Sequence, residues 1–160
     1  MTLPVVPQLQ EDALWCWAAV SSMVATYYAE QLGLGVAYSQ CEVASRTIAQ
    51  PCCPSPPPPP ACRIQQNLQK ALVLVGHLNN RVEASRDFGV VAIEITARRP
   101  LCVAFQYNQG ALHYLLVTGF DPVAQEIALV DPATGVLSTG PYSNLLQNNA
   151  GCWAGWVFTQ

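Results

Sequence analysis

The sequence has few charged residues. Seven Lys and Arg and ten Asp and Glu are spread over 160 residues, which gives a net charge of −3 with neutral His. Nucleic-acid binding needs clustered cations that displace counterions from the phosphates. The scattered cations form no such cluster, so we expect no nucleic-acid partner.

Long apolar runs are also missing, although 51% of the residues are hydrophobic. No run reaches the roughly eighteen apolar residues of a membrane span, so we expect no membrane partner. The start, MTLPVVPQLQ, has neither the basic nor the apolar region of a signal peptide. We therefore expect either export by a route that does not use the N-terminus as its signal or a trimmed chain.

Histidine is scarce as well, which shortens the search for a general base to His77 and His113. His77 follows Gly76 at the end of a predicted helix, and we interpret it as a structural partner of that helix end. His113 lies in GALHYLLVTGFD, near the start of a predicted apolar strand. A lone histidine there is more often a core residue than a base, so its neighbours decide the interpretation.

Cysteine, in contrast, is abundant, with seven residues. Cys41, Cys52, Cys53 and Cys62 are either a tetrathiolate zinc site or a disulfide frame, whose pairing the sequence does not determine. Adjacent Cys52 and Cys53 are awkward ligands for one tetrahedron, which favours disulfides and an oxidising destination. We expect the remaining pair, Cys102 and Cys152, to be buried and reduced in or near a sheet.

The chain divides into a helical half, about 1–99, and a sheet half, about 100–160, which we expect to form one domain. Helical patterns and caps, including a capping box at SQCE and an N-cap at Asp87, predict four helices: 16–33, 40–48, 64–76 and 87–99. β-Branched and aromatic residues predict four antiparallel strands: 101–107, 111–120, 126–132 and 152–160. A helical half followed by a sheet half predicts an α+β fold with a cleft where the halves meet.

The stretch PCCPSPPPPPAC, residues 51–62, is incompatible with a helix or a central strand. Its consecutive prolines favour a stiff polyproline II rod with cysteines at both ends.

Cys16 is the candidate nucleophile, in QLQEDALWCWAAV. It begins a predicted helix, where free backbone N–H groups and the helix dipole favour a thiolate. The alternative is a buried structural thiol between Trp15 and Trp17. Gln10, six residues earlier, and Gln8 are candidate amide donors to an oxyanion, or plain loop residues.

Asp131 is the candidate partner of His113. If the strands that contain them form a hairpin, Asp131 at the end of one lies near His113 at the start of the other. A carboxylate there would orient the imidazole and stabilise its charged form. The alternative is a simple Asp-Pro turn residue.

The segments Q-x5-CWAAV, ALHYLLVTGFD and VDPATG, in this order, resemble the bacterial papain-like cysteine proteases, in the branch with plant-pathogen effector proteases and bacteriocin-leader peptidases. The resemblance spans nearly the whole chain. It implies a papain-like fold, with the helical half packed against the antiparallel sheet and the active-site cleft between them. It also implies site roles: nucleophile Cys16, base His113, orienting acid Asp131 and oxyanion-hole amide Gln10.

The chain departs from this family at GALHY, where many relatives have glycine directly before the histidine. Leu112 at that position would narrow the cleft, to which we also assign Trp15 and Trp17. The proline run is also longer than the resemblance leads us to expect.

The implied function is a cysteine endopeptidase that hydrolyses a protein or peptide through a thioester acyl-enzyme, as a monomer without metal or cofactor. It would be a secreted or injected bacterial effector or toxin, in the cytoplasm of the producing or target cell, with a cognate inhibitor or immunity protein. One alternative is an acyl-transferring or deamidating Cys-His-Asp toxin. Another is a catalytically degenerate binding module that displays its polyproline loop.

Overall fold

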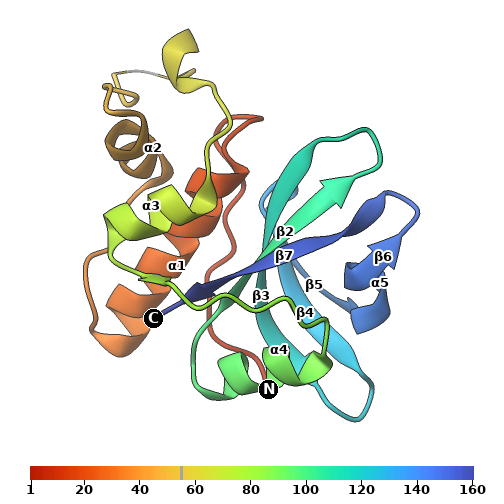
Figure 1. The fold of residues 1–160 in the computed structure, drawn as a ribbon. Coiled ribbons are helices and arrows are strands. Elements are labelled where there is room, and N and C mark those ends of the chain that lie inside the picture. The colour runs from red at the N-terminus through yellow and green to blue at the C-terminus, as the bar shows by residue number, and fades with distance from the viewer. Residues whose placement is uncertain (55) are drawn as a thin grey trace.

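The helices come first along the chain, as expected. The structure, a computed structural model, describes residues 1–54 and 56–160. Its first half contains α1 (Cys16–Leu32), α2 (Gln40–Ile48), the 3-10 helix η1 (Pro60–Cys62), α3 (Leu68–Val75), β1 (Leu78–Asn79) and α4 (Phe88–Thr96). In Figure 1, α1, α2 and α3 gather on one side of the molecule and most of the sheet lies on the other.

The second half forms most of a seven-stranded antiparallel sheet, which confirms the predicted α+β class. Its elements are β2 (Leu101–Tyr107), β3 (Leu112–Asp121), β4 (Glu126–Asp131), β5 (Val136–Pro141), α5 (Tyr142–Leu146), β6 (Gln147–Asn148) and β7 (Gly151–Thr159). The strand order is β1-β7-β2-β3-β4-β5, with β6 beside β7. The sequence did not predict β1, β5, α5 or β6.

Helix α1 is the centre of the helical half. Every residue from Cys16 to Ala25 is buried, so the helix has neighbours all round instead of a single apolar stripe. The small side chains Ala18, Ala19 and Ala25 let those neighbours approach closely. The helix is followed by its C-cap residue Gly33, which has a positive φ of 68°. Glycine adopts this left-handed conformation easily and is common at helix ends for that reason. One continuous core joins this helix to the sheet.

The helix boundaries follow local caps. Ser39 and Glu42 form the predicted capping box of α2, and the Asp87 carboxylate caps α4 by accepting from the Gly89 N–H at 2.7 Å. Helix α3 begins later than predicted, because the Asn67 side chain caps it by accepting from the Gln69 N–H at 2.8 Å. Among the described residues, no helix has both the length and the apolar character that crossing a membrane requires.

The cysteine-rich loop is closed by two disulfides, Cys41–Cys53 and Cys52–Cys62, with Cα–Cα distances of 5.4 and 5.7 Å. They form the frame that the sequence favours over zinc, and they tie residues 51–62 to α2. The predicted straight rod is wrong for the described part of this loop, because the chain bends at Pro56 and Pro57 and turns into η1 at Pro60. Ser55 lies outside the described residues.

The other three cysteines, Cys16, Cys102 and Cys152, are free. Cys102 is fully buried, as expected. Cys152 is only half-buried, so the expectation that it is buried is wrong.

The disulfide frame predicts a defined thiol count. Alkylation of unfolded, unreduced protein is expected to label three thiols, and alkylation after reduction is expected to label all seven; intact mass measures both. Seven labelled thiols without reductant would contradict the frame.

Replacing Cys52 and Cys62 together by Ser should lower the free energy of unfolding by about 3 kcal/mol. The disulfide restricts the unfolded chain, and about 3 kcal/mol is the size of this effect for a short loop.

Candidate active site

Cys16 is the first residue of α1 and is 3% exposed. The residue before it, Trp15, makes no side-chain cap bond within the described part of the chain. The first backbone N–H groups of a helix have no partner inside the helix, and without a cap they leave a positive potential at its start. The fold therefore places the Cys16 sulfur where a negative charge is stabilised.

His113 and Asp131 meet through the β3–β4 hairpin. The two strands pair antiparallel, with Leu116 opposite Val130, so the start of β3 lies near the end of β4. His113 Nε2 donates to Asp131 Oδ1 at 2.7 Å. Asp131 Oδ1 also accepts from the Ala133 N–H at 2.8 Å. Asp131 is thus both the partner of the imidazole and a turn residue.

The same ring interacts with Cys16. Burial acts to lower the pKa of His113, but the hydrogen bond to Asp131, the hydrogen bond with Cys16 and the charges of both residues outweigh it and raise that pKa to about 9. Because Nε2 is occupied by Asp131, Nδ1 is the nitrogen that can serve the sulfur. The imidazole therefore favours its protonated form at neutral pH.

Asp131 is correspondingly held as a carboxylate. Burial acts to raise its pKa, but the hydrogen bond from His113, the Ala133 N–H and the charge of His113 lower it overall. An ionised Asp131 facing a protonated imidazole is the arrangement in which a carboxylate orients a catalytic histidine.

Tyr107 also contacts the site, which the sequence did not indicate. Its ring stacks on the His113 ring, with centroids 5.9 Å apart and planes at 26°. Burial, then the charges of Asp131 and Cys16, raise the pKa of Tyr107, so the phenol stays neutral. The available signal was its place at the end of the strand that pairs with β3. Tyr107 covers one face of the imidazole.

Trp15 and Trp17 do not line a substrate cleft, and that prediction is wrong. Both side chains are 0% exposed. The Trp15 indole N–H donates to the Cys62 carbonyl at 2.7 Å, and the Trp17 indole N–H donates to the Ile64 carbonyl at 3.2 Å. The rings pack in the core because their N–H groups have backbone partners there. They hold the segment after the cysteine-rich loop against α1.

Leu112, directly before His113, is half-buried. Its carbonyl accepts a hydrogen bond from Gln65 Nε2, which joins the helical half to the strand that contains the imidazole. The sequence did not single out Gln65. That the Leu112 side chain narrows the cleft stays a prediction.

Gln10 lies in the loop that leads to Cys16. Its amide nitrogen donates to the Asp12 carbonyl at 3.0 Å and to the Ala13 carbonyl at 2.7 Å, which occupies both amide hydrogens. Gln8 points elsewhere, since its Oε1 accepts from Ser22 Oγ at 3.0 Å. The oxyanion role of Gln10 stays a prediction and requires it to release one of these carbonyls.

Comparison with protein families identifies the chain. The family model described as papain-like cysteine protease AvrRpt2 matches residues 1–150. The chain belongs to this family. Among the curated proteins compared, none matches it. The protein is therefore a papain-like cysteine protease, a hydrolase that acts on peptide bonds, as the motif resemblance implied.

The influence of Asp131 on His113 can be measured directly. Asp131→Ala removes the largest contribution that raises the pKa of His113, so NMR titration of the ring should give a value clearly below about 9. His77 is the internal reference, being the other histidine of the chain. Asp121→Ala is the matched control, because Asp121 also accepts turn N–H bonds but from Val123 and Ala124. An unchanged His113 titration in Asp131→Ala would contradict the assignment.

Proposed function

We propose that Cys16 is the nucleophile and His113 the general acid and base of a cysteine endopeptidase, with Asp131 as the residue that positions the imidazole. The observation that carries the proposal is the hydrogen bond that His113 donates to Asp131 at 2.7 Å, together with the influence of Cys16, which helps to raise the pKa of the same ring. A thiol, an imidazole and a carboxylate that orients the imidazole are the groups that acyl transfer by a cysteine enzyme uses.

In the first half of the reaction, Cys16 reacts as a thiolate paired with protonated His113. The sulfur attacks the scissile carbonyl and forms a C–S bond. The oxyanion is stabilised by the Cys16 backbone N–H and by Gln10 once its amide turns from a loop carbonyl. His113 then gives its proton to the leaving nitrogen, the C–N bond breaks, and the acyl group remains on sulfur as a thioester.

In the second half, neutral His113 takes a proton from water, and the resulting hydroxide attacks the thioester. The C–S bond breaks, the carboxylic acid product leaves, and the thiolate–imidazolium pair is restored. Asp131 keeps one ring orientation throughout, because its Oδ1 holds Nε2 and is itself held by the Ala133 N–H.

We further propose that residues 1–160 act as one monomeric domain and as a secreted or injected bacterial effector. The match to the AvrRpt2 family supports the effector role. The two disulfides support passage through an oxidising compartment. The substrate would be a protein of the target cell, and a cognate inhibitor would protect the producing cell.

The roles of these residues predict distinct losses of activity. Cys16→Ala and His113→Ala should abolish turnover, whereas Gln10→Ala should lower kcat by about 10²–10³-fold and leave measurable hydrolysis. Cys152→Ala is the matched control, because Cys152 is another free cysteine and should be dispensable. Profiling of new protein termini in a proteome treated with wild type or Cys16→Ala measures the effect. Wild type that deamidates substrates without producing new termini would contradict a peptidase.

The raised pKa of His113 predicts an alkaline limit of activity. The imidazole keeps its proton up to a pKa of about 9 in the free enzyme, so kcat/KM should fall as pH rises through that value. The physical reason is loss of the proton that both pairs with the thiolate and protonates the leaving amine. A pH profile measured from neutral pH to above 9 tests this. A fall centred near the ordinary histidine value of 6.5 would be inconsistent with the proposed pair.

A further inference from the structure

Residues 62–65, which we call the strap, follow the cysteine-rich loop and lead toward α3. The backbone of the strap accepts hydrogen bonds from the two indoles that flank the proposed nucleophile. The Trp15 N–H donates to the Cys62 carbonyl at 2.7 Å. The Trp17 N–H donates to the Ile64 carbonyl at 3.2 Å. Both rings are buried, so the position of the strap sets where the start of α1 lies.

The other two residues of the strap extend these links. Arg63 Nε donates to Asp12 Oδ2 at 2.7 Å, in the loop that leads to α1. Gln65 Nε2 donates to the carbonyl of Leu112, the residue directly before His113. Four consecutive residues therefore contact both the start of α1 and the start of the strand that contains the imidazole.

The strap has one covalent anchor, the disulfide between its first residue, Cys62, and Cys52. The Cys52 N–H donates in turn to Ser45 Oγ of α2 at 2.9 Å. Residues 63–65 are exposed, so little apolar burial adds to the hydrogen bonds of the strap. Because each such bond contributes only about 1 kcal/mol, the strap is held weakly once the disulfide is open.

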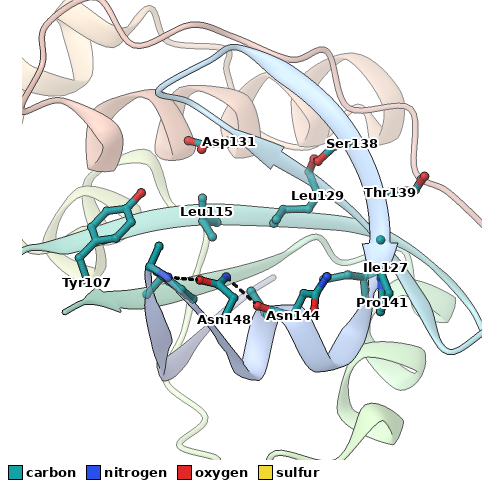
Figure 2. Close-up of a pocket in the computed structure, with 14 residues that line it drawn as sticks. Tyr107, Leu115, Ile127, Leu129, Asp131, Ser138, Thr139, Pro141, Asn144 and Asn148 are labelled. Carbon is teal, nitrogen blue, oxygen red and sulfur yellow. Dashed lines mark hydrogen bonds between the residues drawn. The ribbon is translucent and has the colours of Figure 1, made fainter.

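The two disulfides differ in their access to solvent. Cys53 is exposed and Cys41 is half-buried, whereas neither cysteine of the anchor is more than 1% exposed. A pocket of about 310 Å³ beside them is lined by Glu11, Cys41, Cys52, Cys53, Pro56 and Pro58. The pocket of about 360 Å³ beside Asp131, in contrast, includes no cysteine among its described lining residues (Figure 2). A thiol reductant therefore reaches the Cys41–Cys53 bond more readily than the anchor.

We propose that the strap positions Cys16 against His113 and that the Cys52–Cys62 disulfide makes the activity depend on the redox state of the protein. The inference rests on the proposed peptidase function and adds its regulation. With the disulfide formed, the strap holds the two reacting groups together. With it reduced, the strap detaches and the rate falls, because catalysis by positioned groups is sensitive to displacements of about 1 Å.

The disulfide forms by exchange with a disulfide oxidant. The thiolate of one anchor cysteine attacks the oxidant and releases one of its thiols, and the second anchor thiolate then displaces the other. Overall, the two protein thiols lose two protons and two electrons, and the oxidant becomes two thiols; a dithiol reductant reverses the reaction. Because cytoplasm is reducing and export routes are oxidising, the activity is low in the producing cell and rises on the proposed export.

A redox titration of the wild type in a dithiothreitol buffer tests the proposal. Alkylation and intact mass count the free thiols, which are three in the oxidised protein, five once the exposed disulfide has opened and seven once both have opened. We expect kcat/KM for a peptide that the oxidised protein cleaves to stay near its full value with five thiols. It should fall about tenfold or more with seven. Full activity with seven thiols would overturn the proposal.

The double variant Cys52→Ser with Cys62→Ser should show the same loss in oxidising buffer and no further loss on reduction. Cys41→Ser with Cys53→Ser is the matched control, because the two disulfides span similar separations of 10 and 12 residues. The control should keep near wild-type activity when oxidised and lose it on reduction. Equal activities of the two double variants in oxidising buffer would overturn the role of the anchor.

Hydrogen exchange of the indole N–H groups, followed by NMR, tests the strap without an activity assay. Reduction of the wild type should speed exchange at Trp15 and Trp17 and leave Trp156 unchanged, since the Trp156 N–H donates to the Ser85 carbonyl at 2.9 Å, outside the strap. Unchanged exchange at Trp15 and Trp17, or equal acceleration at all three, would overturn the proposal. If the oxidised wild type cleaves no peptide, the peptidase function fails, and this measurement still decides whether the disulfide holds the strap.

A further variant covers failure of the Cys52→Ser, Cys62→Ser protein to fold, which thermal unfolding would reveal. Gln65→Leu keeps both disulfides and removes the link to the Leu112 carbonyl, so kcat should fall about fivefold, the effect of one hydrogen bond, with KM nearly unchanged. Gln66→Leu is the matched control, because the neighbouring Gln66 side chain makes no hydrogen bond with the described residues. Equal kcat values in the two variants would overturn the positioning role of the strap.

Discussion

The site depends on one hydrogen bond, which His113 Nε2 donates to Asp131 Oδ1 at 2.7 Å. It fixes the ring orientation and leaves Nδ1 for the sulfur, and it is the largest influence raising the pKa of His113 to about 9 against the opposing effect of burial. Because the two residues lie on neighbouring strands, the bond exists only in the observed β3–β4 register. A shift of one residue would turn His113 to the other face of the sheet.

Cys16, the proposed nucleophile, is positioned by the packing of the helical half. Trp15 and Trp17 flank Cys16, and their indole N–H groups bind the Cys62 and Ile64 carbonyls. The Cys52–Cys62 disulfide holds this same segment, and Arg63 Nε donates to Asp12 Oδ2 at 2.7 Å in the loop before the helix. The cysteine-rich loop therefore supports the start of α1.

Much of this arrangement was predictable from the sequence, because its signals are local. The capping box at Ser39 and the periods of the main helices and strands depend on neighbouring residues. The contact between His113 and Asp131 followed from the expected hairpin of their two strands. The burial of Trp15 and Trp17 was not predictable, since their partners are backbone carbonyls nearly fifty positions away. Strand β5 was not predicted for another reason. Most of its residues are exposed, so its sequence shows no alternation of apolar and polar residues.

The two halves of the site are also joined away from the imidazole. The Gln10 backbone N–H donates to the Pro132 carbonyl at 2.8 Å, which links the loop before Cys16 to the turn after Asp131. The Ala133 N–H of that turn holds Asp131 Oδ1. A displacement of the loop before Cys16 would therefore strain the turn that holds the Asp131 carboxylate. This backbone contact couples the position of Cys16 to that of Asp131, although one begins the first helix and the other ends a strand more than a hundred residues later.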